Sequence, residues 1–550
     1  MSFIIYHLSC SPAGAQVTLN GSIQSDILIP KEDKTIGAET DGDWAKTNTY
    51  VDLNMQSRYV DACGRFEYMD HPLPGFENEF RGWGIRHYWV KGKLETGNVS
   101  ADLTLGALYE QFGSGFILRT YEERALGIDN SLLGARLVVK PAKGLTVKAL
   151  TGRQRHYWHY NDALISGADV DYTALLSQQS SLPTTLTLGA SWVNKYENAD
   201  DNPVYADPTH RIHFPSYVNS WDVRASVNRG NVTVLGEYAQ KTDDPSYDNG
   251  YTFRRGTAAL LSASYSKKGM SLLVQAKRSE NMASRSDRTV SGSSSFLNHL
   301  PAFTQDHTYA LAALYPYATQ LALGEWAFQT EFGYTFKRKT LLGGKYGMNV
   351  KVNYSYVRSI DHQYVTTPQG VVDGVSMNYA GTSWYSSSFF KWGDQTYYQD
   401  LNVQLSRKMS KSFKLNLMYM NQRYNQTIVE GHGGMIHSNI FVADGKYQFS
   451  PTTTLRGELQ YLTTADDDGD WVFGLLELSL APHWMLTVSD MYNCGVTDVH
   501  YYQGLVTFNT GAHRLQLGYG RTRAGMNCSG GVCRYVPATC GVTASYTYNF

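Results

Sequence analysis

The sequence predicts an all-β fold: a transmembrane, antiparallel, up-and-down β-barrel of about 26 strands, with about 24 to 28 acceptable. Three observations predict it. Apolar and polar residues alternate with a period of two along most of the chain, as in strands with one apolar and one polar face. Short turns alternate with long polar segments. The alternation also continues to the last residue, Phe550.

The two ends of the mature chain have the same pattern. In residues 541–550 every second residue is apolar or aromatic, and small polar residues lie between them. Residues 17–29 alternate in the same way. A membrane barrel must pair its first and last strands, because an open sheet edge cannot face lipid. We therefore expect these two segments to pair, with Phe550 as the barrel-closing residue.

The internal strands show which face is wet. Segments 99–107, 326–337, 348–356, 413–419 and 455–461 alternate, and their charged residues share a face with Ser, Thr and Asn. The opposite face is aliphatic and aromatic, which suits lipid. The face predicted to line a wet lumen carries Asp102, Lys148, Glu331, Lys351, Arg456 and Glu458. The count of about 26 strands includes an extra strand near residues 293–300.

The connections fall into two classes. The short ones contain Gly, Pro or Asn and lie at 141–144, 228–231, 267–269, 450–452 and 481–483. The long polar ones lie at 31–46, 71–82, 110–129, 197–215, 360–394 and 525–537. Short periplasmic turns and long outer loops are typical of outer-membrane barrels. The expected location is the cell outer membrane, with both termini in the periplasm.

Composition narrows the alternatives. The 550 residues include 40 Tyr, and aromatic residues are 13 % of the chain, which fits interfacial aromatic girdles. The formal charge of -1 and the lack of a basic stripe argue against a nucleic-acid partner. No catalytic or cofactor-binding motif is present, so we expect no enzyme and no cofactor. A large soluble all-β protein is the alternative fold.

The N-terminus indicates export. Residues 1–15 resemble a signal peptide, with a short apolar core and a small-x-small site at Ala13-Gly14-Ala15. No Lys or Arg precedes the apolar core, which leaves open a start upstream. Residues 16–550 are expected to form a single barrel domain with long outer loops.

The segment 110–129 is the densest cluster of charge and glycine, and we expect it to fold into the lumen. Gly113 and Gly115 permit tight turns. The charged residues Arg119, Glu122, Glu123 and Arg124 could pair at helical spacing. Two interpretations remain open: a loop that narrows or gates a pore, and a static brace of lumenal salt bridges.

Other polar clusters are weaker. Cys528 and Cys533 flank a Gly-Gly pair, and an exported chain favours a disulfide there, with free thiols or pairing to Cys540 as alternatives. Histidine pairs lie at 156/159, 210/213 and 432/437, and an acidic run spans 466–470. These are better explained as solvated loops than as metal sites, so no metal site is predicted.

Five blocks of the chain carry a family resemblance. They lie at residues 21–26, 111–124, 315–319, 342–347 and 528–537. Together they make the chain similar to an uncharacterised family of Bacteroidota-type outer-membrane barrels, known as a domain of unknown function. The resemblance implies an outer-membrane location, no assigned activity, and thioredoxin-like or surface lipoproteins as partners.

Two functions follow as expectations. The first is a transport or translocation pore, partly plugged by its own loops and working with lipoprotein partners. The alternative is a non-conducting scaffold that anchors surface or periplasmic lipoproteins, for which the Tyr-rich segment 361–392 is the feature. A TonB-type transporter is disfavoured, because no plug domain precedes the first strand. Lipid, lipopolysaccharide and the barrel assembly machinery are the remaining expected partners.

Overall fold

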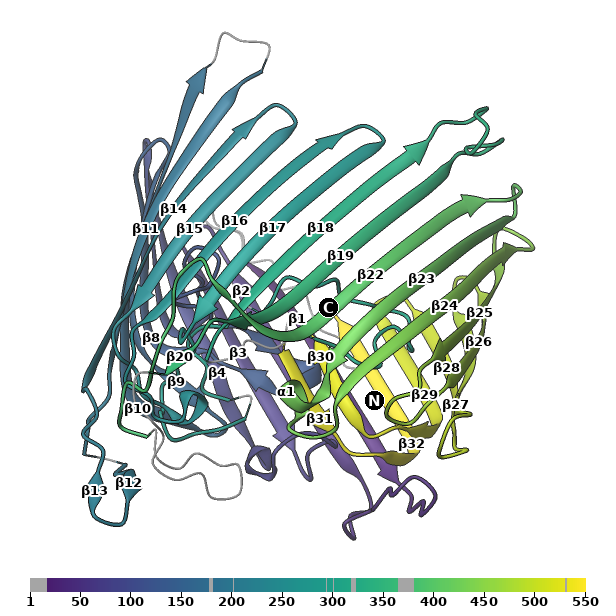
Figure 1. Cartoon of the computed structure of the whole chain (residues 1–550), viewed down its shortest axis with the longest axis horizontal. Helices are drawn as coiled ribbons and strands as arrows, with labels where there is room; N and C mark the ends of the chain where they lie inside the picture. The colour runs from purple at the N-terminus through teal and green to yellow at the C-terminus, as the bar shows by residue number, and fades with distance from the viewer. Residues whose placement is uncertain are drawn as a thin grey trace.

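In the computed structural model, the described residues are 17–177, 182–200, 202–292, 294–299, 301–317, 323–364, 380–529 and 532–550. They contain one 24-stranded antiparallel sheet that closes into a barrel (Figure 1). The count is close to the predicted 26.

The barrel strands are β1 (Thr18–Pro30), β2 (Lys46–Gln56), β3 (Val60–Met69), β4 (Gly82–Thr96), β5 (Val99–Leu108), β8 (Leu132–Ala142), β9 (Leu145–His156), β10 (His159–Ser177), β11 (Thr184–Tyr196), β14 (Tyr217–Arg229), β15 (Val232–Lys241) and β16 (Gly256–Lys267). They continue with β17 (Met270–Glu280), β18 (Glu325–Phe336), β19 (Met348–Ile360), β22 (Trp392–Lys408), β23 (Phe413–Asn425), β24 (Met435–Gln448), β25 (Thr453–Thr463), β26 (Trp471–Leu480), β27 (Trp484–Asn493), β28 (His500–Thr510), β29 (His513–Thr522) and β32 (Thr539–Asn549).

Short elements lie in the connections. They are η1 (Asn78–Phe80), β6 (Glu122–Glu123), η2 (Arg124–Leu126), β7 (Ile128–Asp129), β12 (Tyr205–Asp207), β13 (His210–Arg211), η3 (Tyr247–Asn249), β20 (Gln363–Tyr364), β21 (Tyr385–Ser386), α1 (Gln426–Glu430), β30 (Gly525–Ser529) and β31 (Val532–Val536). Among the described residues, no helix has the length and apolar character needed to cross a membrane.

The first and last strands close the barrel. β1 and β32 pair antiparallel from Ser22 opposite Asn549 to Pro30 opposite Gly541. Beyond this ladder, Phe550 and Gly21 exchange two backbone hydrogen bonds of 2.9 and 3.0 Å. The ring of Phe550 lies so close to Gly21 that a Cβ there would come within 2.6 Å of it. The C-terminal residue therefore completes the seam.

The extra strand expected near residues 293–300 was wrong, and Ser293 and Leu300 themselves lie outside the described residues. The described part of 281–324 contains no barrel strand and connects β17 directly to β18. The segment is polar, but it does not alternate with an apolar face that could contact lipid. It enters the barrel instead.

The connections divide between the two ends of the barrel. The end at which β1 begins and β32 ends has short turns, such as 97–98, 143–144, 230–231, 268–269 and 511–512. The long connections 31–45, 70–81, 109–131, 197–216, 281–324, 361–391 and 523–538 all lie at the other end. We call these the short-turn end and the long-loop end. This is the division into two classes that the sequence predicts.

The wall separates apolar from polar side chains. On β10, Asp169 is buried on the inner face, whereas the neighbouring Val170 and Tyr172 are 41 % and 49 % exposed outside. Large apolar side chains, including Leu261 and Leu459, cover the outer face of the other strands in the same way. Such a surface requires an apolar surrounding, so this is a membrane-spanning barrel.

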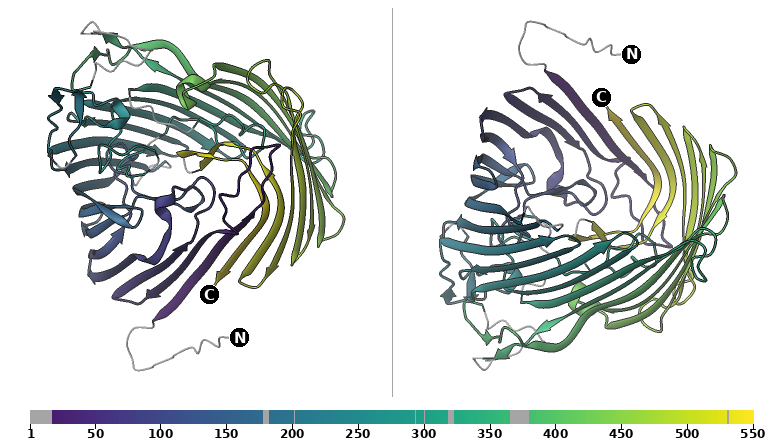
Figure 2. Two further views of the ribbon diagram at one scale, coloured as in Figure 1. Left: turned by 90° about the horizontal axis from the view of Figure 1, so that it is seen from below. Right: turned by 90° about the horizontal axis from the view of Figure 1, so that it is seen from above.

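Among the described residues, two connections that fold back into the barrel form most of the site (Figure 2). We call residues 109–131, between β5 and β8, the first inner loop. The described residues of 281–317, between β17 and β18, are the second inner loop. Buried apolar residues of both loops pack against the inner face of the wall, so the hydrophobic clusters of this protein lie inside the barrel.

Candidate functional site in the barrel lumen

The first inner loop consists of two small hairpins. In the first, Gln111 and Arg119 form an isolated bridge, and Phe112 donates its backbone N–H to the carbonyl of Leu118. Gly113 and Gly115 form its tip with φ of 52° and 98°, which favour glycine. The second hairpin pairs β6 with β7 through η2. Neither hairpin extends the strand ladder of the wall, so side chains hold the loop in place.

Apolar contacts fix the tip of the loop. Phe112 and Leu118 are fully buried, and Phe116 and Ile117 nearly so. They belong to a cluster whose wall residues include Ile165, Val193, Ala239, Ala258 and Leu260 of β10, β11, β15 and β16, together with residues of β5, β8 and β9.

Glu237 on β15 binds the tip by hydrogen bonds. The backbone N–H of Ser114 donates to both carboxylate oxygens of Glu237 at 3.0 and 3.1 Å, and the Ser114 hydroxyl donates at 2.6 Å. A Cβ at Gly113 would meet the same carboxylate at 2.5 Å. Glycine at this position therefore allows the backbone to approach the wall closely.

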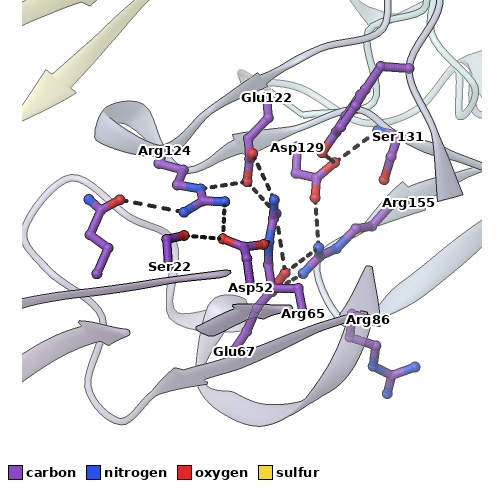
Figure 3. Close-up of polar contacts among 12 residues, drawn as sticks. Ser22, Asp52, Arg65, Glu67, Arg86, Glu122, Arg124, Asp129, Ser131 and Arg155 are labelled. Atoms are coloured by element: carbon purple, nitrogen blue, oxygen red, sulfur yellow. Dashed lines mark hydrogen bonds and ion pairs between the residues drawn. The ribbon is translucent and has the colours of Figure 1, made fainter. Parts of the chain in front are cut away.

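A charge cluster fastens the other end of the loop to β2 and β3 (Figure 3). Arg65 donates from Nε to Asp52 at 2.6 Å and from Nη1 and Nη2 to Glu122 at 2.5 and 3.1 Å. Arg124 donates to Asp52 at 2.9 Å and to Glu122 at 3.1 Å. Burial raises the pKa of Glu122, and the Arg65 guanidinium opposes this rise. Two loop residues and two wall residues thus form one closed network.

A second set of charges continues the cluster toward β9. Arg155 donates to Glu67 at 2.5 and 2.9 Å and to Asp129 of the loop at 2.7 Å. The Tyr109 hydroxyl also donates to Asp129, at 3.0 Å. Burial works against the charge of Asp129, but the Arg155 guanidinium outweighs it and lowers the Asp129 pKa to about 2. With the four residues above, the cluster contains three guanidiniums and four carboxylates.

The second inner loop packs on the first. Arg119 donates its backbone N–H to the carbonyl of Leu297 at 2.8 Å and its Nη1 to the carbonyl of His299 at 2.7 Å. In return, Asn298 donates to the carbonyl of Phe116 at 2.6 Å. These contacts use backbone groups on both sides, so the two inner loops are bound to each other as well as to the wall.

Buried lysines hold the second inner loop to the wall. Lys195 and Lys241 donate to Asp244 at 2.7 and 3.1 Å, and the Ser284 hydroxyl of the loop donates to Asp244 at 2.7 Å. Lys241 also donates to the carbonyl of Ala283 at 2.5 Å. Burial opposes the charge of Asp244, yet the nearby Lys195 ammonium holds the Asp244 pKa below its ordinary value.

The rest of the second inner loop covers the opposite wall. The Leu311 backbone donates to Gln460 at 2.8 Å, Gln422 donates to the carbonyl of Tyr315 at 2.9 Å, and His307 contacts Asp400 at 2.7 Å. Its buried side chains pack against apolar lumenal residues of β23 to β26, including Met420, Ile440, Leu462 and Trp471. The two inner loops together thus reach both sides of the barrel.

A cavity lies between the loop tip and the wall. It has a volume of about 320 Å³, and its polar lining comes from both loop and wall: Gln111, Ser114, Lys148, Asp169, Asp171, Thr187, Arg224, Ser226 and Glu237. Arg224 is paired with Asp169 at 2.5 Å and with Asp171 at 2.7 Å. The lining therefore mixes both signs of charge.

The structure brings most of the predicted loop residues together. Gly113 and Gly115 form the tip, Glu122 and Arg124 enter the charge cluster, and Arg119 contacts the second inner loop. Glu123 instead caps η2, where its carboxylate accepts the N–H of Ala125. The expected helical spacing was wrong: this stretch contains only β6 and the three-residue η2, and Glu122 pairs with Arg124 two residues on.

Sequence reasoning missed the wall partners Asp52, Arg65, Glu67 and Arg155, and it missed the second inner loop. The only available signal for the wall partners was charge on the lumenal face of predicted strands. Predicted lumenal pairs occur elsewhere on the wall as well. Lys351 contacts Glu331 at 2.7 Å, and Arg456 pairs with Asp444 and Glu458, where the Tyr309 hydroxyl of the second inner loop also donates to Asp444.

The cysteine-containing connection lies over the first inner loop. Cys528 and Cys533 form a disulfide across the β30–β31 hairpin, and Cys540 is a free, buried thiol. β30 contacts η2, and Arg534 pairs with Glu77 at 2.6 Å. Within the described ranges, no group of three or more His, Cys, Asp or Glu side chains could hold a metal ion.

The family assignment comes from a sequence model. The model of a family of unknown function (DUF6029) matches residues 2–550. The chain belongs to this family. A search of curated proteins found no match.

A search of solved structures found matches at low sequence identity. A variant ferric enterobactin receptor from Pseudomonas aeruginosa, in complex with enterobactin, is 10 % identical with a TM-score of 0.45, covering 97 % of this chain and 81 % of that one. The siderophore receptor PirA from Acinetobacter baumannii is 11 % identical with a TM-score of 0.44, covering 97 % and 80 %. OpdK from Pseudomonas aeruginosa, with vanillate, is 12 % identical with a TM-score of 0.34, covering 86 % and 98 %.

Proposed function

We propose that this DUF6029 protein is an outer-membrane transport barrel whose lumen is gated by its first inner loop. The short-turn end, with both termini, faces the periplasm, and the long-loop end faces the outside. One observation carries the proposal: the first inner loop crosses the lumen from the charge cluster on β2 and β3 to Glu237 on β15.

The way the loop is attached supports a gate. In the described part of the chain, no strand ladder or covalent bond ties the tip to the wall. Hydrogen bonds and apolar contacts hold the tip, and ion pairs hold the other end of the loop. Buried ion pairs add little net stability, because desolvation offsets their attraction, but they define one geometry. Such an attachment can therefore open and close again as a unit.

The lining supports a polar cargo. The cavity beside the tip is lined by side chains of both charges and by hydroxyl side chains, and Leu235 is the aliphatic residue among them. A hydrated solute with polar or charged groups matches such walls better than an apolar one. The size of the cargo depends on how far the loops withdraw.

The direct test is single-channel conductance of the purified protein in planar bilayers. The variant deletes residues 114–124, and the control deletes residues 203–213, an equal length around β12 and β13. We expect a closed wild type and control, and a conducting deletion variant. If the deletion variant also stays closed, the gate is refuted. The protein would then be better explained as a scaffold.

The partners in this proposal come from the family resemblance. Thioredoxin-like proteins and surface lipoproteins are proposed to dock on the long-loop end, over the β30–β31 hairpin and its disulfide. Affinity purification from crosslinked outer membranes tests this. Loss of the same lipoproteins in a variant lacking residues 525–536 would support the docking site, and unchanged recovery would refute it.

A further inference from the structure

One sector of the short-turn end is strongly basic. Four turns and their flanking residues carry eleven Lys and Arg side chains and not one Asp or Glu, although the whole chain has a formal charge of -1. The sequence windows are 264–272, 335–348, 405–415 and 446–453. The eleven residues are Lys267, Lys268, Lys337, Arg338, Lys339, Lys345, Arg407, Lys408, Lys411, Lys414 and Lys446.

Strand pairing makes these turns neighbours. Thr335 donates its backbone N–H to Gly269, Arg407 pairs with Met348, and Gln448 donates to Ser412. The turns after β16, β18, β22 and β24 thus follow one another along one edge, at the upper right of Figure 1. We call this the basic rim.

The charges of the basic rim are uncompensated. Arginines of the lumen, such as Arg65 and Arg224, are paired with carboxylates. In the part of the chain that the structure describes, none of the eleven basic-rim side chains forms a salt bridge. All are exposed except Arg407, which is half-buried. The basic rim is therefore suited to an anionic ligand that this chain does not supply.

The turn 337–347 adds an apolar group at the centre. Leu341 is 98 % exposed and Leu342 50 % exposed. The turn is ordered by its own hydrogen bonds: Lys339 donates to the carbonyl of Gly344 at 2.6 Å, and Gly344 donates to Thr340 at 2.8 Å. Leu341 and Leu342 are adjacent and exposed on an ordered turn, so they form a small apolar patch that suits an apolar surrounding better than water.

The turn also leans toward the lipid side of the wall. On β22, Arg407 lies an even number of residues from the outward-facing Leu401, so its side chain is on the outer face of the wall. Gly344 of the turn lies against this side chain, because a Cβ at Gly344 would overlap the Arg407 guanidinium. Just inside the rim, Phe336 packs on Tyr334 with ring centres 4.9 Å apart, and Phe413 faces Tyr447. Aromatic side chains followed by basic ones are typical of a membrane–water interface.

We infer that the basic rim binds anionic phospholipid headgroups of the adjacent leaflet, with Leu341 and Leu342 inserted among the first acyl-chain carbons beneath those headgroups. Lys and Arg near an anionic membrane surface each add attraction, and an apolar anchor adds hydrophobic burial. The lipid phosphate is favoured over a soluble acidic protein because the leucines lie beside the lipid-facing wall. This inference rests on the proposed membrane location but not on the gate.

The test is native mass spectrometry of the full chain in detergent, titrated with phosphatidylglycerol or phosphatidylcholine. The variant replaces Lys337, Arg338, Lys339 and Lys345 with Gln. The control removes four exposed cations of the same end outside the basic rim: Lys140→Gln, Lys143→Gln, Arg229→Gln and Arg514→Gln. We expect wild type and control to retain about tenfold more phosphatidylglycerol than phosphatidylcholine, and the variant to lose that preference.

A fluorophore on Leu341→Cys gives a second measurement, in bilayers that contain phosphatidylglycerol. We expect the blue-shifted emission of an apolar site. Equal retention of the two lipids by wild type would overturn the inference, as would an equal loss in variant and control. Emission typical of a fluorophore in water would also overturn the inference, and would indicate that the basic rim binds an acidic protein instead. Conductance enters neither measurement, so these outcomes leave the gate untouched.

Discussion

Substituting Arg65 should release the first inner loop. Its side chain is 6 % exposed and joins Asp52 of the wall to Glu122 of the loop. Arg65→Met removes the guanidinium and keeps much of the volume, leaving two carboxylates that share only Arg124. Removing one partner of a buried ion pair costs about 3–5 kcal/mol. We use the lower end, because Arg124 still contacts both carboxylates.

A loss of about 3 kcal/mol raises the fraction of undocked loop about 150-fold. Amide hydrogen exchange measures this directly, because the N–H groups of Phe112, Gly115 and Asn130 are bonded within the loop. We expect peptides covering residues 109–131 to exchange about two orders of magnitude faster in Arg65→Met, while peptides from β22 to β27 are unchanged. Conductance should rise in parallel.

Two further variants test whether the charge cluster anchors the loop. Lys351→Met breaks a lumenal pair, with Glu331, that contacts neither inner loop, so it should leave exchange in 109–131 at the wild-type rate. Glu122→Gln combined with Arg65→Met should cost less than the sum of the two single changes, because both remove one contact. Unchanged exchange in Arg65→Met, or strict additivity, would refute the charge cluster as the loop's anchor.

Three other predictions concern the same elements. In conductance titrations, the fraction of closed channels should peak near pH 4 to 5. The pKa of Glu122 is raised in the docked loop, so protonation of Glu122 favours docking. The pKa of Asp129 is lowered, so its charge stabilises docking by roughly 2 kcal/mol, and this stabilisation disappears as the pH falls from 3.8 through 2. A monotonic profile would contradict this. Glu237→Gln should lower the free energy that binds the loop tip to the wall by about 1–3 kcal/mol. Single-channel recordings should then show brief openings without full release of the loop, and lasting openings would contradict this prediction. Gly21→Val should lower the thermal unfolding midpoint, because its Cβ would meet Phe550, and an unchanged midpoint would argue against the close seam.

Much of the barrel could be predicted because a membrane wall imposes a strict rule on every strand. Lipid outside and water inside require apolar and polar residues to alternate along each strand. The alternation in residues 541–550 is therefore enough to predict a membrane-spanning strand there. The seam between β1 and β32 follows from the need to pair every edge. The strand predicted near residues 293–300 was wrong, because a segment that folds into the lumen does not contact lipid and need not alternate.

The loop residues of the site could be predicted from the sequence, but their partners on the wall could not. The charges of Glu122 and Arg124 were visible because a dense charged segment interrupts the alternation. Their partners Asp52 and Arg65 sit on ordinary strands, where a lumenal charge looks the same whether it faces water or a loop. Which wall positions meet the loop depends on how it folds back, and local periodicity carries no information about that.

The imbalance of the charge cluster bears on whether the loop is a gate or a brace. Four carboxylates against three guanidiniums leave one excess negative charge in a buried site, and burial raises the pKa of Glu122 above its ordinary value. A permanent brace gains nothing from such an excess, since apolar packing would hold the loop with less desolvation. An unbalanced cluster makes docking depend on one proton or one approaching cation, and that sensitivity is useful only to a loop that moves.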